Sequence, residues 1–268
     1  MMVDLLGYAG ERVVVTGAAS GMGAAAARLL GELGAEVHAL DVKPIDLPVK
    51  QSIHCDLSDR TSIDAAVPKL PDSLFGLFHC AGLPGPPFSN LDTMLVNFVG
   101  PRHLTQALLP RVVRGGAVTS ITSVAGMGWQ KNRDSVEALL DTPDFKTARV
   151  WCEANPERAN GYLFSKQCII LETMRRAAEW VDREVRVNCI SPSPTDTPML
   201  SSFHQQVSRE FLEEHFLSPV GRNATPEEQA EPLLLLGSRA ARFVSGQNLF
   251  VDFGYVASVE CGARKSLL

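Results

Sequence analysis

Short runs of β-branched and apolar residues alternate along this chain with longer stretches of helical periodicity, a pattern typical of βαβ units around a parallel sheet. Several of the apolar runs are apolar throughout, as expected where helices cover both faces of a sheet. The pattern predicts an α/β fold of Rossmann type, with a single, doubly wound parallel sheet of about seven strands and helices on both faces. The predicted strands cover residues 12–16, 36–40, 52–55, 74–80, 117–121, 185–190 and 248–251. The predicted helices cover 22–33, 59–67, 92–113, 162–181 and 226–236.

One stretch before Tyr162 interrupts this alternation, and we expect a helical insertion over about 129–160. Thr142 is the predicted N-cap of its second helix, and Asn155, which precedes a proline, is the predicted stop. The apolar residues of the insertion need a surface to pack on, for which a partner subunit and the mouth of an active site are both candidates. Its helix signals cover 135–141 and 143–154, with apolar residues Leu139, Leu140, Phe145, Ala148 and Trp151.

Length and composition exclude several classes of protein. The 268 residues, 45% hydrophobic and 21% charged, fit one globular domain over 1–268. A net charge of −5 without a basic stripe argues against nucleic acid as a partner. No apolar run approaches the roughly 18 residues that span a membrane, and no signal peptide is recognisable, so we expect a cytoplasmic protein. The six cysteines and six histidines show no metal-ligand spacing, so reduced thiols and no metal site are expected.

The first predicted strand runs directly into a glycine-rich turn, residues 16–23, that opens an alanine-rich helix. Glycines let a backbone turn tightly and approach a pyrophosphate, whose charge then lies at the helix N-terminus, where N–H groups are free. This strand–turn–helix context predicts a dinucleotide-binding site. The residues expected to bind the cofactor there are Gly17, Ser20, Gly21, Met22 and Gly23.

Asp41 follows the second predicted strand, about 20 residues beyond the turn, where a carboxylate accepts both ribose hydroxyls of NAD. The 2′-phosphate of NADP would meet a like charge at this position. The glycine turn contains no Arg or Lys, and Lys43 is the one basic residue near Asp41 in sequence. The sequence therefore predicts NAD in preference to NADP.

Tyr162 and Lys166 are four residues apart, on adjacent turns of one helix face. A tyrosine with the ordinary pKa of about 10 is a poor base at neutral pH. An ammonium about 5 Å away favours the tyrosinate by roughly 3 kcal/mol, or about two pKa units, at an effective dielectric constant of about 20. The spacing therefore predicts that Lys166 lowers the pKa of Tyr162 toward the range of a general acid and base.

These motifs, taken in order, resemble those of the short-chain dehydrogenase/reductase family over nearly the whole chain. The glycine turn is similar to the family's TGxxxGxG loop, and Tyr162, Ser165 and Lys166 are similar to its YxxSK signature. Its adenine-site, catalytic Asn, catalytic Ser and nicotinamide-loop motifs are matched by Asp56-Leu57, Asn97, Ser123 and 191–197. There are two departures: Cys80-Ala81-Gly82 stands where the family has Asn-Ala-Gly, and Ser193 where it usually has Gly.

The resemblance implies hydride transfer between NAD and a secondary alcohol or a ketone. It implies that Tyr162 exchanges the hydroxyl proton, and that Lys166 lowers the tyrosine pKa and holds the nicotinamide ribose. It implies that Ser123 hydrogen-bonds the substrate oxygen, and that Asn97 holds a water linking Lys166 to solvent. The further residues that it implies at the cofactor are Asp56, Leu57, Cys80, Ala81, Gly82, Pro192, Thr195 and Thr197.

The insertion is similar to that of a subgroup containing bacterial 3α-hydroxysteroid dehydrogenase/carbonyl reductase and coniferyl alcohol dehydrogenase. There the insertion obstructs the usual tetramer interface, so the resemblance implies a homodimer, with a homotetramer as the alternative. It also implies a hydroxysteroid or another bulky apolar carbonyl substrate, with a coniferyl-type aromatic alcohol as the alternative.

Residues 196–219 directly follow the predicted nicotinamide loop and are rich in apolar side chains. They are predicted to form either a lid over a bulky substrate or an ordinary two-helix segment with core residues. These apolar residues are Met199, Leu200, Phe203, Phe211, Leu212, Phe216 and Leu217. From another class of function, a non-catalytic NAD-binding sensor or scaffold has the same fold. Such a protein is expected to lose the proton-transfer residues that this chain retains.

Overall fold

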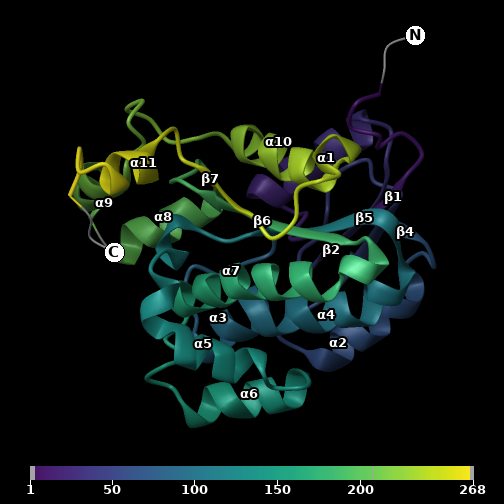
Figure 1. Ribbon diagram of the computed structural model, residues 1–268, viewed down its shortest axis with the longest axis horizontal. Coiled ribbons are helices and arrows are strands. Elements are labelled where there is room, and N and C mark those ends of the chain that lie inside the picture. The colour runs from purple at the N-terminus through teal and green to yellow at the C-terminus, as the bar shows by residue number, and fades with distance from the viewer. Residues whose placement is uncertain (1–3, 207, 266–268) are drawn as a thin grey trace.

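The computed structural model describes residues 4–206 and 208–265, and its centre is a seven-stranded parallel sheet (Figure 1). The strand order β3-β2-β1-β4-β5-β6-β7 places β1 and β4 side by side, where the direction of winding reverses. This confirms the doubly wound, Rossmann-type sheet predicted from the sequence. The strands are β1 Arg12–Thr16, β2 Glu36–Asp41, β3 Gln51–His54, β4 Leu74–His79, β5 Val112–Ile121, β6 Arg186–Pro192 and β7 Asn248–Val251.

Helices cover both faces of the sheet, and each face has its own apolar core (Figure 1). On one face Leu30 and Leu233 belong to the core that contains Phe78 of β4. On the other face Leu104 and Ile170 belong to the core that contains Leu77 of β4. The first face carries α1 Gly21–Glu32 and α10 Pro226–Gly237, and the second carries α2 Arg60–Ala66, α4 Gly100–Leu108 and α7 Tyr162–Glu179.

The prediction of one long helix over 92–113 is wrong at the C-terminal end of that range. The helix starts as α3 Asn90–Met94, passes through a π-helical turn at Leu95–Val99 and continues as α4. A 3₁₀ turn at Leu109–Arg111 follows, and β5 begins at Val112. Pro110 has no N–H to continue the helical hydrogen bonds, and the β-branched Val112 and Val113 favour a strand.

The insertion consists of α5 Arg133–Leu140 and α6 Phe145–Ala154, and it packs on α7, α3 and the π-helical turn of the same chain. The Trp151 ring stacks on Phe164 of α7, with ring centroids 6.1 Å apart. Its buried apolar residues therefore extend the core on the α4 and α7 face of the sheet. They are Val136, Leu139, Leu140, Phe145, Ala148 and Cys152.

A buried arginine connects this insertion to α4. Arg102 donates hydrogen bonds to the carbonyl oxygens of Leu139 and Leu140, at 3.2 and 3.3 Å, and to the hydroxyl of Thr142 at 2.8 Å. The prediction that Thr142 is the N-cap of α6 is therefore wrong. Asp144 caps the helix instead, because the Thr142 hydroxyl is already bound to the end of α5.

Two further helices, α8 Pro198–Gln206 and α9 Arg209–Phe216, follow β6, and α11 Tyr255–Glu260 follows β7 (Figure 1). Thr225 caps α10 as predicted, and Glu228 completes a capping box. In the part of the chain that the structure describes, no helix is both long and apolar enough to cross a membrane.

Candidate active site

The carboxyl ends of β1, β4, β5 and β6 lie at one edge of the sheet, and a cavity of about 450 Å³ is present there. Open α/β sheets bind their ligands at this edge, near the point where the strand order reverses. The structure brings many of the predicted site residues together around this cavity. They are Met22, Cys80, Ala81, Gly82, Ser123, Tyr162, Lys166, Pro192, Thr195 and Thr197.

The predicted phosphate-binding turn lies between β1 and α1 and contains very close backbone approaches. Gly17 has φ +72°, and a Cβ atom there would lie 2.6 Å from Cα of Ala81. A Cβ atom at Gly23 would collide with the carbonyl oxygen of Gly17. Ser20 is the N-cap residue of α1, but its side chain makes no capping hydrogen bond to the described residues. Gly21 is the first residue of the helix. The open N-terminus and the absence of side chains fit a pyrophosphate.

The two predicted carboxylates at the adenosine end are fixed by hydrogen bonds from nearby residues. Asp41 accepts hydrogen bonds from the N–H groups of Ala19 at 3.0 Å and Lys43 at 2.9 Å, so it borders the glycine turn. Asp56 accepts from the N–H and hydroxyl of Ser58 at 2.8 and 2.7 Å. The adjacent Leu57 is buried in the core on the α4 face.

Tyr162, Ser123 and Lys166 meet at one end of the cavity. Tyr162 is the first residue of α7, and Ser123, the second residue after β5, hydrogen-bonds to its phenol. The Nζ atom of Lys166 lies 5.3 Å from the centroid of the Tyr162 ring and donates to the carbonyl of Ile121 at 3.0 Å. Gly161, at φ +83°, allows α7 to begin close to α3, since a Cβ atom there would lie 2.6 Å from Oδ1 of Asn90.

The pKa of Tyr162 departs from its ordinary value in the direction opposite to the prediction. Burial raises it, and the hydrogen bond from Ser123 opposes that rise. Burial also lowers the pKa of Lys166 to about 8. The prediction counted the attraction of the ammonium but left out the loss of water around a buried phenolate. Tyr162 therefore holds its proton at neutral pH and is able to donate it to a carbonyl oxygen.

Asn97 lies in the π-helical turn and connects the loop after β4 to the helix that carries Tyr162. Its Oδ1 accepts from the N–H of Leu83 at 2.7 Å, and its Nδ2 donates to the carbonyl of Leu83 at 3.0 Å and to Oγ of Ser165 at 3.1 Å. Both amide hydrogens are thus engaged. An amide oxygen has two lone pairs, so Oδ1 is able to accept one more hydrogen bond.

The turn after β4 compensates for its departure from the family motif. Thr16 Oγ1 accepts hydrogen bonds from the N–H groups of Cys80 and Ala81, at 3.2 and 3.4 Å. Burial raises the pKa of Cys80 to about 12, so its thiol stays neutral beside Lys166. In the loop after β6, Thr195 donates to the carbonyl of Ser193 at 2.8 Å, which stabilises this loop although it has Ser in place of Gly.

Apolar residues of α8 and α9 form another part of the cavity wall. Met199, Leu200, Phe203 and Phe216 line it, and the Phe203 ring meets the Tyr162 ring edge-on at 5.1 Å. Phe211 and Leu217 do not line it, and the side chain of Leu212 lies outside the described residues. Four of the predicted apolar residues are therefore placed as in a lid, and we call 196–219 the lid segment.

Sequence reasoning missed the loop that faces the lid segment. Pro84, Pro86 and Asn90 line the cavity, and Gln206 at the end of α8 donates to the carbonyl of Pro86 at 2.8 Å. A proline-rich run after the fourth predicted strand was the available signal for this loop. Nothing in the sequence pairs Gln206 with a residue 120 positions earlier.

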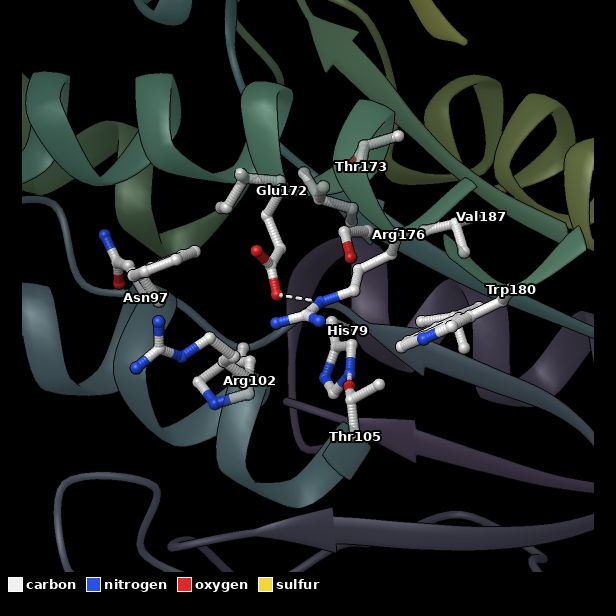
Figure 2. Close-up of a pocket in the computed structure, with 16 residues that line it drawn as sticks. His79, Asn97, Arg102, Thr105, Glu172, Thr173, Arg176, Trp180 and Val187 are labelled. Carbon is white, nitrogen blue, oxygen red and sulfur yellow. Dashed lines mark hydrogen bonds and ion pairs between the residues drawn. The ribbon is translucent and has the colours of Figure 1, made fainter. Parts of the chain in front are cut away.

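A second cavity, of about 50 Å³, lies between α4 and α7 behind the site (Figure 2). His79 hydrogen-bonds to Thr105 at 2.6 Å, while Glu172 pairs with Arg176 on the next turn of α7. His79 Nδ1 and Glu172 Oε2 are buried without a partner among the described residues. A polar space of this size accommodates ordered water, which satisfies such groups. Ile121 lines both cavities, so this polar space borders the site.

Comparison with known proteins agrees with this geometry. Residues 11–133 match the model of the short chain dehydrogenase family, and residues 150–256 match a model described as enoyl-(acyl carrier protein) reductase. Coniferyl-alcohol dehydrogenase of Pseudomonas sp. is 32% identical over 253 residues, covering 92% of this chain and 97% of that protein. The 3-alpha-hydroxysteroid dehydrogenase/carbonyl reductase of Comamonas testosteroni is 30% identical, covering 90% and 95%.

A solved structure shows the same fold. The crystal structure of the 3-alpha-hydroxysteroid dehydrogenase from Pseudomonas sp. B-0831, complexed with NADH, matches with a TM-score of 0.77 at 27% identity, over 95% of this chain and all of that chain. The chain belongs to the short-chain dehydrogenase/reductase family. It is a nicotinamide-dependent oxidoreductase that acts on CH–OH groups, as the motifs predicted.

Proposed function

We propose that this dehydrogenase interconverts a secondary alcohol and a ketone with NAD, and that its substrate is a hydroxysteroid or a similar bulky, apolar and uncharged molecule. One observation carries the proposal: Tyr162, Ser123 and Lys166 meet at one end of a cavity of about 450 Å³ whose other wall is apolar. This cavity includes the residues that we assign to the nicotinamide, and its part beside the apolar side chains of α8 and α9 is where a bulky apolar substrate would lie. Among the described residues that line the cavity, Lys166 is the only one with a charged side chain.

Tyr162 is the proposed proton-transfer residue. In ketone reduction its phenol donates a proton to the carbonyl oxygen, and in alcohol oxidation the phenol must first lose its proton, after which the phenolate accepts the hydroxyl proton. Ser123 hydrogen-bonds the phenol and, we propose, also the substrate oxygen, which fixes the reacting group beside Tyr162. Lys166 stabilises the phenolate by its charge. When bound, the nicotinamide supplies the hydride acceptor or donor.

We propose that Asn97 acts on the solvent side of Lys166. Its Oδ1 already holds the N–H of Leu83 and has a lone pair for one water. The amide hydrogens fix the orientation of the side chain by binding Leu83 and Ser165. The water would then relay protons between Lys166 and solvent.

The cofactor site that we propose fits NAD better than NADP. The glycine turn and the N-terminus of α1 hold the pyrophosphate, through the residues Gly17, Ser20, Gly21, Met22 and Gly23. Asp41, fixed by two N–H groups, accepts from the adenosine ribose, and its charge repels a 2′-phosphate. Asp56 and Leu57 are assigned to the adenine, and the nicotinamide half is assigned to Cys80, Ala81, Gly82, Tyr162, Lys166, Pro192, Thr195 and Thr197.

An aromatic alcohol of the coniferyl type is the second candidate substrate. The relative at 32% identity is a coniferyl-alcohol dehydrogenase. The edge-on contact between Phe203 and Tyr162 places an aromatic ring beside the reacting centre, where it is able to pack on a planar substrate.

A substrate panel separates these candidates. Purified protein is given 3-hydroxysteroids and cinnamyl-type alcohols with NAD or NADP, and the reduced cofactor is followed by its absorbance. We expect steroid oxidation with NAD, and a Tyr162→Phe variant with at least about a thousandfold lower kcat, since that phenol carries the proton. An Asp41→Asn variant is expected to lose most of the preference for NAD. A Tyr162→Phe variant with wild-type turnover contradicts the proposed mechanism.

We propose that the protein is one domain over 1–268 that acts as a homodimer in the cytoplasm. β7 is an edge strand of the sheet, and exposed apolar residues lie on it and close to it in sequence. They are Phe243, Leu249, Phe250 and Phe253. Such a patch is typical of an interface, whereas the α4 and α7 face is covered by the insertion. The six unpaired cysteines fit a reducing compartment.

A further inference from the structure

The end of the lid segment is held by the C-terminal part of the chain. The carbonyl oxygen of Leu217, directly after α9, accepts a hydrogen bond from Nη1 of Arg264 at 2.8 Å. The same guanidinium lies over the ring of Tyr255 on α11, 5.3 Å from its centroid. Arg264 therefore connects α11 to the C-terminal end of α9. A hydrogen bond from a charged donor is stronger than a neutral one.

The connection reaches the substrate cavity through one aromatic contact. The Tyr255 ring packs on the Phe216 ring, with centroids 6.2 Å apart, and Phe216 lines the cavity. Tyr255 also forms a small buried cluster with Val124 and Val256. Val124 follows Ser123 and lines the cavity as well. The C-terminal segment thus packs against two walls of the cavity at once.

The base of this support is fixed to the sheet. Asp252, directly after β7, is buried and accepts hydrogen bonds from the N–H groups of Gly254 at 2.9 Å and Val256 at 2.8 Å. These bonds hold the start of α11 against the end of β7. The N–H of Arg264 binds the carbonyl of Ser258 at 2.9 Å, which turns the chain back toward α9. A short, hydrogen-bonded path therefore runs from the sheet to the lid segment.

We propose that Arg264 is a specificity-determining residue of this enzyme: by holding Leu217 it keeps Phe216 in the cavity wall and sets the width of the substrate site. Within the lid segment, the C-terminal end of α8 is held by Gln206 on the carbonyl of Pro86. Arg264 touches neither the reacting atoms nor the cofactor residues, so it acts by positioning Phe216. The identity of the bulky substrate rests on the proposed function. The anchoring of Leu217 by Arg264 does not depend on it.

The anchoring is tested without any substrate by hydrogen–deuterium exchange of the Arg264→Gln variant. We expect the amides of 209–217 to exchange about tenfold faster than in the wild type, because opening of this segment no longer breaks a charge-assisted bond. The amides of 133–154, in the insertion, are expected to be unchanged. Arg242→Gln is the matched control, an exposed arginine of the same C-terminal region. Unchanged exchange in 209–217 overturns the proposal.

The effect on specificity is measured with two alcohols of different size. For Arg264→Gln we expect a five- to tenfold higher KM for the bulky alcohol, an unchanged kcat/KM for a small one such as cyclohexanol, and partial recovery in Arg264→Lys, which keeps a charged donor. Faster exchange with an unchanged ratio of the two kcat/KM values refutes the role in specificity. A wild-type protein that oxidises cyclohexanol but no bulky alcohol refutes the proposed substrate, and the exchange comparison still decides the anchoring.

Discussion

The insertion and the lid segment are both two-helix additions to the sheet, but they are held in different ways. The insertion buries six apolar side chains in the main core, and Arg102 fixes the end of α5. In the lid segment, α8 has no buried residue, and its apolar side chains face the substrate cavity. Hydrogen bonds to backbone carbonyls hold the end of α8, through Gln206, and the end of α9, through Arg264.

This difference shows that apolar residues in a predicted helix pair have one of two roles, in the core or in a ligand cavity. Apolar side chains that pack on the core stabilise the fold, whereas those that line a cavity stabilise the bound ligand. Mutations in the insertion should therefore lower the free energy of unfolding, and mutations in the lid segment should weaken substrate binding. Three of the next four predictions test that division, and the other concerns His79 on β4. They run from the largest expected effect to the smallest.

Leu139→Ala should cause the largest loss of stability. Leu139 is fully buried between α5 and the core, and such a truncation costs about 3–4 kcal/mol through lost burial and the cavity that it leaves. Chemical denaturation measures this loss. The matched change in the other region is Phe211→Ala on α9, where the side chain is 40% exposed, and we expect a loss below about 1 kcal/mol. Equal losses in both variants would contradict the comparison.

Acid pH should destabilise the fold through His79, the buried residue at the end of β4. Burial lowers the pKa of His79 to about 4, whereas an unfolded histidine has a pKa of about 6.5. The unfolded chain therefore binds a proton in this range that the folded chain does not bind. The stability from neutral His79 is complete above pH 6.5 and is lost as the pH falls to 4, by about 3 kcal/mol. Urea unfolding at pH 7 and pH 4.5 measures it, and His79→Gln should reduce the pH dependence.

Arg102→Met should lower stability by about 2 kcal/mol, since it leaves the carbonyl oxygens of Leu139 and Leu140 without their charged donor. The matched control is Arg133→Met on α5, an exposed arginine paired with Glu137, for which the expected loss is below about 0.5 kcal/mol. Thermal unfolding of both variants at one pH gives the comparison. A greater effect at Arg133 would show that the end of α5 is held by another contact.

Phe203→Ala should have the smallest effect on stability and a clear effect on binding. The side chain packs directly on Tyr162 and lines the cavity, and its loss is expected to raise KM for a bulky alcohol about tenfold, or about 1.4 kcal/mol. The unfolding midpoint should stay close to that of the wild type. Steady-state kinetics and a melting curve on the same preparation test both statements. A large drop in the midpoint would make Phe203 a core residue.

Local patterns in the sequence were sufficient to predict the sheet, the glycine turn and the Tyr162–Lys166 pair, because each depends on neighbouring residues. The N-cap of α6 was predicted wrongly, since Thr142 is bound by Arg102, a residue 40 positions earlier. The direction of the Tyr162 pKa was wrong for a similar reason: burial depends on the whole fold. The contact between Arg264 and Leu217 leaves no signal in either segment alone.

The cover that the insertion provides over α7 has a consequence for work at low enzyme concentration. A catalytic helix that relied on a second subunit for its apolar contacts would lose them on dilution, by mass action. Here α7, with Tyr162 and Lys166, receives those contacts from α5 and α6 of its own chain. Turnover per active site should therefore stay constant when the protein is diluted from micromolar to nanomolar.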